Sequence, residues 1–207
     1  MTSVQQPTPA RRGPKPKPHT RTNLIRAGVR MLHEAGYSAT GIQDIVDAAE
    51  VPKGSFYNHF ESKESFGAEV VDAYFEAALV DLRGMLANPE IEPLERLKTY
   101  FATRCRSLKA AGYVKGCLLG NLSLEVSDQS DAIRERLSAH FKTWSRLFED
   151  CIAQAQKAGT IRNRVPAPSL APFVLNSWEG TLLRMRVEKN DAAYKDFIRV
   201  MFENVLV

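Results

Sequence analysis

The stretch that decides the fold is residues 40–66, which read TGIQDIVDAAEVPKGSFYNHFESKESF. Apolar residues recur in it at helical spacing over 42–49 and again over 53–60. The dipeptide Val51-Pro52 separates the two runs, because a proline interrupts the helix in which it would stand. The stretch therefore predicts two short helices joined by a tight turn, which is the helix-turn-helix arrangement.

The start of the first short helix carries a capping pattern. Thr40 stands three residues before Gln43, as in a capping box, so we expect the helix to begin at Thr40. A longer helix is expected to run before it from Thr20 to Gly36, since glycine tolerates the left-handed backbone found after helix ends.

The second short helix presents a candidate DNA-reading face. Phe56 and Phe60 stand four residues apart and are expected to face the core. A helical rotation of about 100° per residue then defines an outward face and two flanks. The outward residues are Gly54, Tyr57 and Asn58, and the flanking residues are Ser55 and His59. Lys53 lies at the amino end, where recognition helices meet base edges.

The chemistry of these side chains predicts separate roles on DNA. Lys53, Ser55 and Asn58 can hydrogen-bond to base edges and are expected to read sequence. Tyr57 and His59 carry O–H and N–H groups suited to phosphates, and such contacts set the register of the protein on DNA.

The positive charge is concentrated at the N-terminal end. The net charge is +4, and residues 1–60 hold eight Lys and Arg against four acids, whereas the remainder is balanced. This favours a head that binds a polyanion, although a solvated basic tail gives the same pattern. Residues 1–19 hold five prolines and no hydrophobic periodicity, which predicts a disordered basic arm. Arg11 and Arg12 are predicted DNA contacts, and a flexible tether is the alternative.

Every later segment has helical periodicity. A long helix is expected from Ser62 to about Asn88-Pro89, and four apolar stripes follow it. We therefore expect an all-α fold of about nine helices, with a three-helix head joined by the long helix to a helical body. The predicted domains are the basic arm (1–19), the helix-turn-helix DNA-binding domain (20–66), and the ligand-binding and dimerisation domain (67–207).

Residues 40–66 resemble the DNA-binding signature of the TetR family of transcriptional repressors. The shared features are the capping threonine, the turn AAEV at 48–51, and the run KGSFYNHF at 53–60 before a Ser-Lys-Glu helix start. Glu50 stands where the family usually has glycine, so an altered turn is expected. The resemblance covers residues 24–71 and implies a dimer that binds a palindromic double-stranded DNA operator. The positions that commonly touch DNA in this family match Thr40, Lys53, Tyr57, His59 and Lys63.

The body of the chain carries no catalytic or metal-binding pattern. Its histidines and cysteines lack the spacing of a metal site, a catalytic triad or a C-x-x-C pair. We expect no metal, no cofactor and no enzyme activity. No apolar run approaches the roughly 18 residues of a membrane span, and the three cysteines do not form a disulfide framework. We therefore expect a cytoplasmic protein without membrane contact.

Residues 116–128, GCLLGNLSLEVSD, are the unusual part of the body. Cys117 stands at a predicted helix start beside Lys115, and both features stabilise a thiolate. Cys117 is therefore a candidate reactive sensor, and a small buried apolar residue is the alternative. The candidate lining residues of a small pocket are Tyr100, Phe101, Asn121 and Trp178, for which ordinary helix packing is the alternative.

Residues 116–128 and the run WEGTLL at 178–183 resemble a TetR subgroup that answers electrophiles and small unsaturated acids. It includes the NemR-like and the acrylate-responsive AcuR-like repressors, and the latter is the expected best match. A subgroup cysteine corresponds to Cys117, and a lysine corresponds to Arg186, whose guanidinium suits a carboxylate. The resemblance implies a small-molecule inducer such as acrylate. It is expected either to add to Cys117 or to bind reversibly through Arg186 or Lys115.

The last two helical segments, residues 168–188 and 191–206, are apolar over more than one face. We expect two such hairpins to form a homodimer interface. The interface candidates are Trp178, Leu182, Phe197, Met201 and Phe202. The sequence as a whole predicts a ligand-released repressor. The alternatives are a nucleic-acid-associated structural protein without a ligand, and a carrier or enzyme with an incidental basic end.

Overall fold

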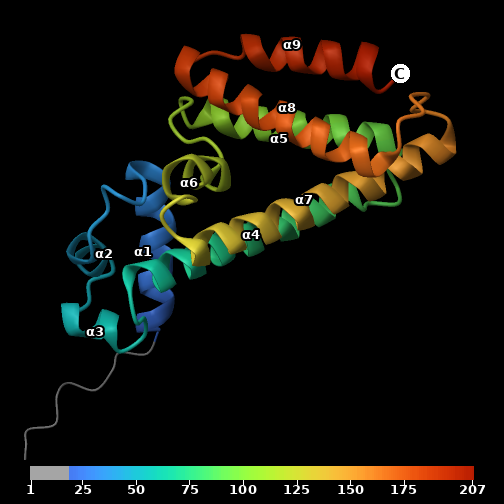
Figure 1. Ribbon diagram of the computed structural model, residues 1–207. Coiled ribbons are helices and arrows are strands. Elements are labelled where there is room, and N and C mark those ends of the chain that lie inside the picture. The colour runs from blue at the N-terminus through green and yellow to red at the C-terminus, as the bar shows by residue number, and fades with distance from the viewer. Residues whose placement is uncertain (1–18) are drawn as a thin grey trace, which may run out of the picture.

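The computed structural model describes residues 19–207, and this part of the chain folds into nine α-helices with no strand (Figure 1). The head consists of α1 (Thr20–Ala35), α2 (Ile42–Ala48) and α3 (Lys53–Tyr57), and α4 (Lys63–Leu86) joins it to the body. The body adds α5 (Pro93–Ala110), α6 (Leu118–Val126), α7 (Asp131–Ala158), α8 (Ala167–Glu188) and α9 (Ala192–Val200), followed by a π-helical turn (Met201–Val205). The predicted all-α fold is confirmed. Arg11 and Arg12 lie outside the described residues.

The head is built around a small aromatic core. Phe56 of α3 packs on Phe66 of α4 with ring centroids 5.2 Å apart, and both side chains are fully buried. The predicted end of α1 is confirmed, because Gly36 follows it with a φ of 89°. In the turn between α2 and α3, Glu50 has a φ of 55°. A glutamate thus occupies a left-handed backbone conformation that glycine adopts without steric cost.

The predicted capping box at Thr40 is wrong. The Thr40 hydroxyl donates to the Gly36 carbonyl at 2.7 Å, so it closes the loop after α1 and is not available to cap α2. The N-cap of α2 is Gly41, whose N–H donates to the Asp44 carboxylate at 2.8 Å. Because only 1% of Thr40 is exposed, its side chain cannot contact DNA in this conformation.

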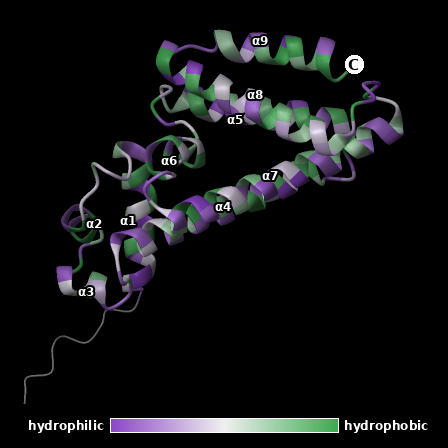
Figure 2. Cartoon of the chain, in the orientation of Figure 1, coloured by the Kyte–Doolittle hydropathy of each residue, from purple (hydrophilic) through white to green (hydrophobic). Residues whose placement is uncertain are grey.

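The body is layered, with α4 and α7 side by side and α5, α8 and α9 stacked beyond them (Figure 1). Along α4 and α7 hydrophilic and hydrophobic residues alternate, as in helices with one buried face (Figure 2). The body core centres on Phe101, whose ring lies 5.0 Å from that of Trp178 and 4.8 Å from that of Phe197. Among the described residues no helix is long and apolar enough to cross a bilayer.

Four of the five residues expected at the dimer interface are buried in the core of one chain. Trp178, Leu182, Phe197 and Met201 are all buried within a single protomer, and only Phe202 is partly exposed. They are covered because α9 folds back over α8 and both helices pack towards Phe101 of α5. The large apolar residues that α8 and α9 leave exposed are instead Phe173, Leu183, Val187 and Val200.

Candidate DNA-reading surface and ligand cavity

Helix α3 presents its polar residues away from the protein. Phe56 is buried, whereas Lys53, Gly54, Tyr57 and Asn58 are exposed. Ser55 and His59 lie half-buried at the flanks, so the arrangement follows the rotation expected of a helix. These side chains are free to enter a DNA groove.

Lys63 is engaged within the head. Its ammonium group donates to the Tyr37 carbonyl at 2.7 Å and lies 4.3 Å from the centroid of the Tyr37 ring. Burial lowers the pKa of this lysine. The ammonium group keeps two further N–H donors, so Lys63 could bind a DNA phosphate while it stays hydrogen-bonded to the Tyr37 carbonyl.

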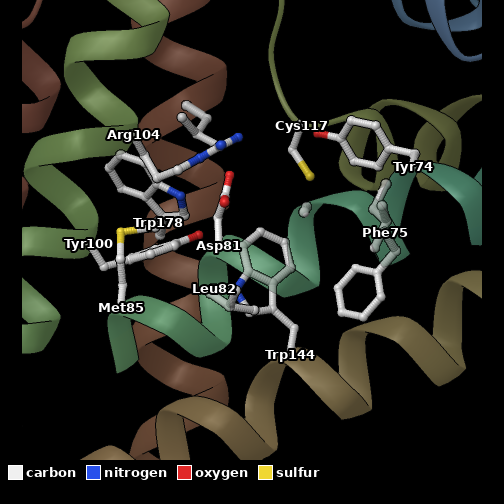
Figure 3. Close-up of a pocket in the computed structure, with 13 residues that line it drawn as sticks. Tyr74, Phe75, Asp81, Leu82, Met85, Tyr100, Arg104, Cys117, Trp144 and Trp178 are labelled. Atoms are coloured by element: carbon white, nitrogen blue, oxygen red, sulfur yellow. The ribbon is translucent and has the colours of Figure 1, made fainter. Parts of the chain in front are cut away.

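An inner cavity of about 40 Å³ lies where α4, α5, α6, α7 and α8 meet (Figure 3). That volume holds only about three water molecules. Three of the predicted ligand residues line it, namely Tyr100, Cys117 and Trp178. Phe101 does not, because its side chain is buried in the aromatic core. The other lining residues were not predicted as ligand residues, and they are Tyr74, Phe75, Ala78, Asp81, Leu82, Met85, Arg104, Leu119, Trp144 and Leu182.

An outer cleft of about 710 Å³ lies between α6, α7 and α8. It contains the other two predicted ligand residues, and the Arg186 guanidinium donates to the Asn121 side-chain oxygen at 3.1 Å. Cys117 lines both spaces. Of the six predicted ligand residues, Phe101 lines neither space, and the other five are divided between two adjacent spaces that share Cys117.

Cys117 is the N-cap residue of α6, as expected, but its surroundings do not favour a thiolate. The predicted ammonium neighbour is absent, since Lys115 pairs with Glu34 at 3.0 Å. Burial and the neighbouring Glu179 carboxylate raise the pKa of the thiol, which donates a hydrogen bond to Glu179. The resting state of Cys117 is a neutral thiol.

Glu179 is a partly buried carboxyl group in the wall of the outer cleft, beside Cys117. Burial raises its pKa to about 7, although the Cys117 hydrogen bond and the Arg104 charge oppose this shift. One oxygen, Oε1, is buried without a hydrogen-bond partner among the described residues. The signal in the sequence was an acid directly after Trp178 in a helix whose neighbouring residues are mostly apolar.

Helix α6 connects the cavity to the head. At its N-terminal end, His33 of α1 hydrogen-bonds to the Gly116 carbonyl at 2.8 Å. At its C-terminal end, the Glu125 carboxylate accepts the backbone N–H groups of Tyr37 at 2.9 Å and Ser38 at 2.7 Å. Despite burial, these bonds hold the pKa of Glu125 below its usual range. A shift of α6 would therefore move the end of α1.

Comparison with known proteins gives a consistent assignment over most of the chain. Residues 24–70 match the family described as bacterial regulatory proteins, tetR family, and residues 93–201 match the family described as Tetracyclin repressor-like, C-terminal domain. The HTH-type transcriptional repressor DhaR of Mycobacterium sp. (strain GP1) is 41% identical over 90% of this chain and 92% of that protein. The transcriptional regulator AcuR of Cereibacter sphaeroides is 36% identical over 86% and 81%, respectively. AcuR, the expected best match, is thus less similar to this chain than DhaR is.

A solved structure agrees with the same assignment. The crystal structure of a regulatory protein TetR from Rhodobacter sphaeroides superimposes with a TM-score of 0.83 at 32% identity. The match covers 89% of this chain and 98% of that one, so head and body are arranged alike in both.

Proposed function

Because the chain belongs to the TetR family of bacterial transcriptional repressors, we propose that it is a homodimer released from its operator by a small molecule in the inner cavity. Proteins of this family bind DNA and are not enzymes. The observation that carries the proposal is the placement of α6, which contributes Cys117 to the cavity and holds the head through Glu125.

The exposed face of α3 reads the operator. Lys53 and Asn58 have the donors and acceptors for base edges, with the half-buried Ser55 beside them. Tyr57 is 57% exposed and contacts phosphate. A two-fold dimer carries two such helices, which enter successive major grooves about 34 Å apart on a palindrome.

Dimerisation uses the outer faces of α8 and α9. Phe173, Leu183 and Val200 are each about half exposed in one protomer, and Val187 is 74% exposed. Exposed apolar residues gathered on two adjacent helices are typical of a protein interface. Phe202, from the predicted set, is partly exposed and packs towards Phe101 and Lys98 of α5 instead.

The inducer is a small, compact molecule, of which an unsaturated carboxylate such as acrylate is the first candidate. The volume of the inner cavity supports a ligand of a few heavy atoms. Reversible binding is favoured over covalent addition, since the Cys117 thiol is neutral and buried. Arg186 would bind the carboxylate of a ligand that extends into the outer cleft.

The dimer leaves the operator if the ligand binds more tightly to a conformation of the body in which the two DNA-binding heads no longer fit successive major grooves. Helix α6 transmits the change, because its N-cap contributes to the cavity wall and its C-terminal end is hydrogen-bonded to residues 37 and 38. A ligand with equal affinity for both conformations would not release the protein from its operator.

The test is footprinting of the DNA upstream of the gene, without and with sodium acrylate. We expect a protected site with two-fold symmetry, and protection that fades as acrylate is added. Absence of any sequence-specific protection would contradict the repressor proposal. A footprint that acrylate leaves unchanged would contradict only this inducer.

A further inference from the structure

The chain has only two tryptophans, and both line the inner cavity. Trp178 is 0% exposed and Trp144 is 7% exposed, so each is more than nine-tenths buried. The indole Nε1 atom of each is buried without a hydrogen-bond acceptor among the described residues. Buried indole N–H groups normally have an acceptor, so two unpaired donors at one cavity require an explanation.

The other polar groups of the cavity are mostly donors as well. Burial raises the pKa values of Tyr74 and Tyr100, so both phenols stay protonated. The Tyr74 oxygen accepts a long hydrogen bond of 3.5 Å from the Leu118 N–H, which leaves its own proton available. Arg104, an exposed residue at the edge of the cavity, adds a guanidinium group that makes no ion pair or hydrogen bond within residues 19–207.

Figure 3 shows how these groups are arranged around the cavity. Arg104, Tyr100 and Trp178 lie on one side and Cys117 and Tyr74 on the other, with Trp144 below them. Asp81, an exposed residue, is the one acidic group among the lining residues. Glu179 lies outside this lining, in the wall of the outer cleft beside Cys117. The remaining walls are largely apolar, formed by Phe75, Leu82, Met85, Leu119 and Leu182.

We infer that Trp144 and Trp178 form a hydrogen-bonding subsite for the carboxylate of a short-chain carboxylic acid, with Arg104 as its counter-charge. A carboxylate is an acceptor-only group with two oxygens, so it matches several donors that lack acceptors. Charge-assisted bonds from the guanidinium strengthen the match. The short hydrocarbon chain packs on the apolar walls, and the small volume limits its length. This inference rests on the proposed ligand-released function and assigns the ligand's chemical class and the groups that recognise it.

The test uses the two indole groups as reporters. In protein labelled with ¹⁵N-tryptophan, each of the two Nε1–H groups gives its own cross-peak. Titration with sodium acetate, propionate and butyrate is expected to shift both indole proton resonances downfield with at least one of the acids. The neutral analogue 1-propanol is expected to leave them in place. Unmoved resonances with all three acids, or equal shifts with 1-propanol or sodium chloride, would overturn the inference.

Two substitutions separate this subsite from a general loss of structure. Arg104→Gln is expected to weaken binding of the acid that shifts the resonances by about 10-fold. Arg106→Gln, two residues further along α5, is the matched control, because Arg106 is exposed like Arg104 but does not line the cavity and bonds only to Thr103. Replacement of both tryptophans by the isosteric benzothienyl amino acid removes only the two N–H groups. It is expected to abolish binding, measured by isothermal titration calorimetry because the indole resonances are gone, while the helical circular dichroism stays unchanged. Unweakened binding in either altered protein would contradict the subsite.

Operator binding distinguishes this inference from the proposed function. If the protein binds its operator specifically but no acid shifts the indole resonances, the repressor stands and the carboxylate subsite fails. If an acid binds and shifts both resonances but leaves operator affinity unchanged, the subsite stands and ligand release through this cavity fails.

Discussion

Glu179 is the residue whose protonation has the largest expected effect on the body. Its pKa is raised from 4.5 to about 7 by burial, with the Cys117 thiol and Arg104 as its charged or titratable neighbours. A carboxyl group with a raised pKa binds its proton more tightly in the folded state. It therefore lowers the free energy of unfolding as the pH rises from 4.5 to about 7.

We expect Glu179→Gln to remove this dependence, because an amide does not titrate. The effect is up to about 3 kcal/mol between the two ends of the range. Urea denaturation at about pH 5 and about pH 8 measures it. The control is Glu61→Gln at an exposed position. An identical pH dependence in wild type and Glu179→Gln would show that burial does not shift this carboxyl.

Glu50 is the second residue whose substitution is expected to change the free energy of unfolding. Its φ of 55° is unfavourable for any side chain with a Cβ atom, so Glu50→Gly is expected to stabilise the head by about 1 kcal/mol. Thermal unfolding measures the gain. Glu50→Ala removes the same charge but keeps the Cβ atom, and is expected to give no such gain. An equal gain from alanine would assign the effect to charge rather than to backbone strain.

Helix α3 is the element on which sequence recognition depends. Tyr57→Ala is expected to weaken binding to operator and random DNA alike, since a phosphate contact carries no sequence information. Lys53→Ala is expected to cost about 1–3 kcal/mol on the operator and less on random DNA. Fluorescence anisotropy with both duplexes measures the difference. Lys98→Ala on α5, far from the head in sequence, is the control, and unchanged operator affinity in both α3 variants would refute the assignment.

The helices and the outward face of α3 could be predicted from the sequence because hydrophobic periodicity is a local property, whereas the cap predicted at Thr40 was wrong. The ligand cavity could not, since Arg104, Trp144 and Tyr74 come from three helices that meet only in the folded body. The same limit explains why the sequence wrongly placed the Lys115 ammonium group as a partner of the Cys117 thiol. Glu34, which is 81 residues away in the sequence, binds this ammonium group in the folded protein. Tertiary contacts also buried Trp178 and Phe197, which helical periodicity alone allowed to face outward.

The dimer is the property of the whole molecule that depends most on exposed apolar residues. Phe173 is 52% exposed on α8, and an aspartate placed there would be buried without a partner in the dimer. We expect wild type to sediment as a dimer at micromolar concentration and Phe173→Asp to shift towards monomer. Val80→Asp on α4, also at an exposed apolar position, is the matched control. A monomeric wild type, or a Phe173→Asp variant that dimerises as wild type does, would contradict this interface.

For the whole molecule, we propose that ligand binding in the inner cavity and operator binding by α3 are coupled through α6. Coupling is reciprocal, so a ligand that weakens operator binding by some factor must itself bind more weakly to the operator complex by the same factor. Glu125→Gln weakens the link between α6 and the backbone of Tyr37 and Ser38, whereas Asp128→Asn changes an exposed acid three residues further on.

The most direct measurement is therefore the operator dissociation constant with and without saturating ligand, in wild type, Glu125→Gln and Asp128→Asn. We expect a decrease in operator affinity of at least 5-fold in wild type and in Asp128→Asn, as is typical of allosteric coupling. Glu125→Gln is expected to bind the ligand with unchanged affinity but to show a smaller decrease. A ligand that fills the cavity of wild type and leaves its operator affinity unchanged would contradict the claim.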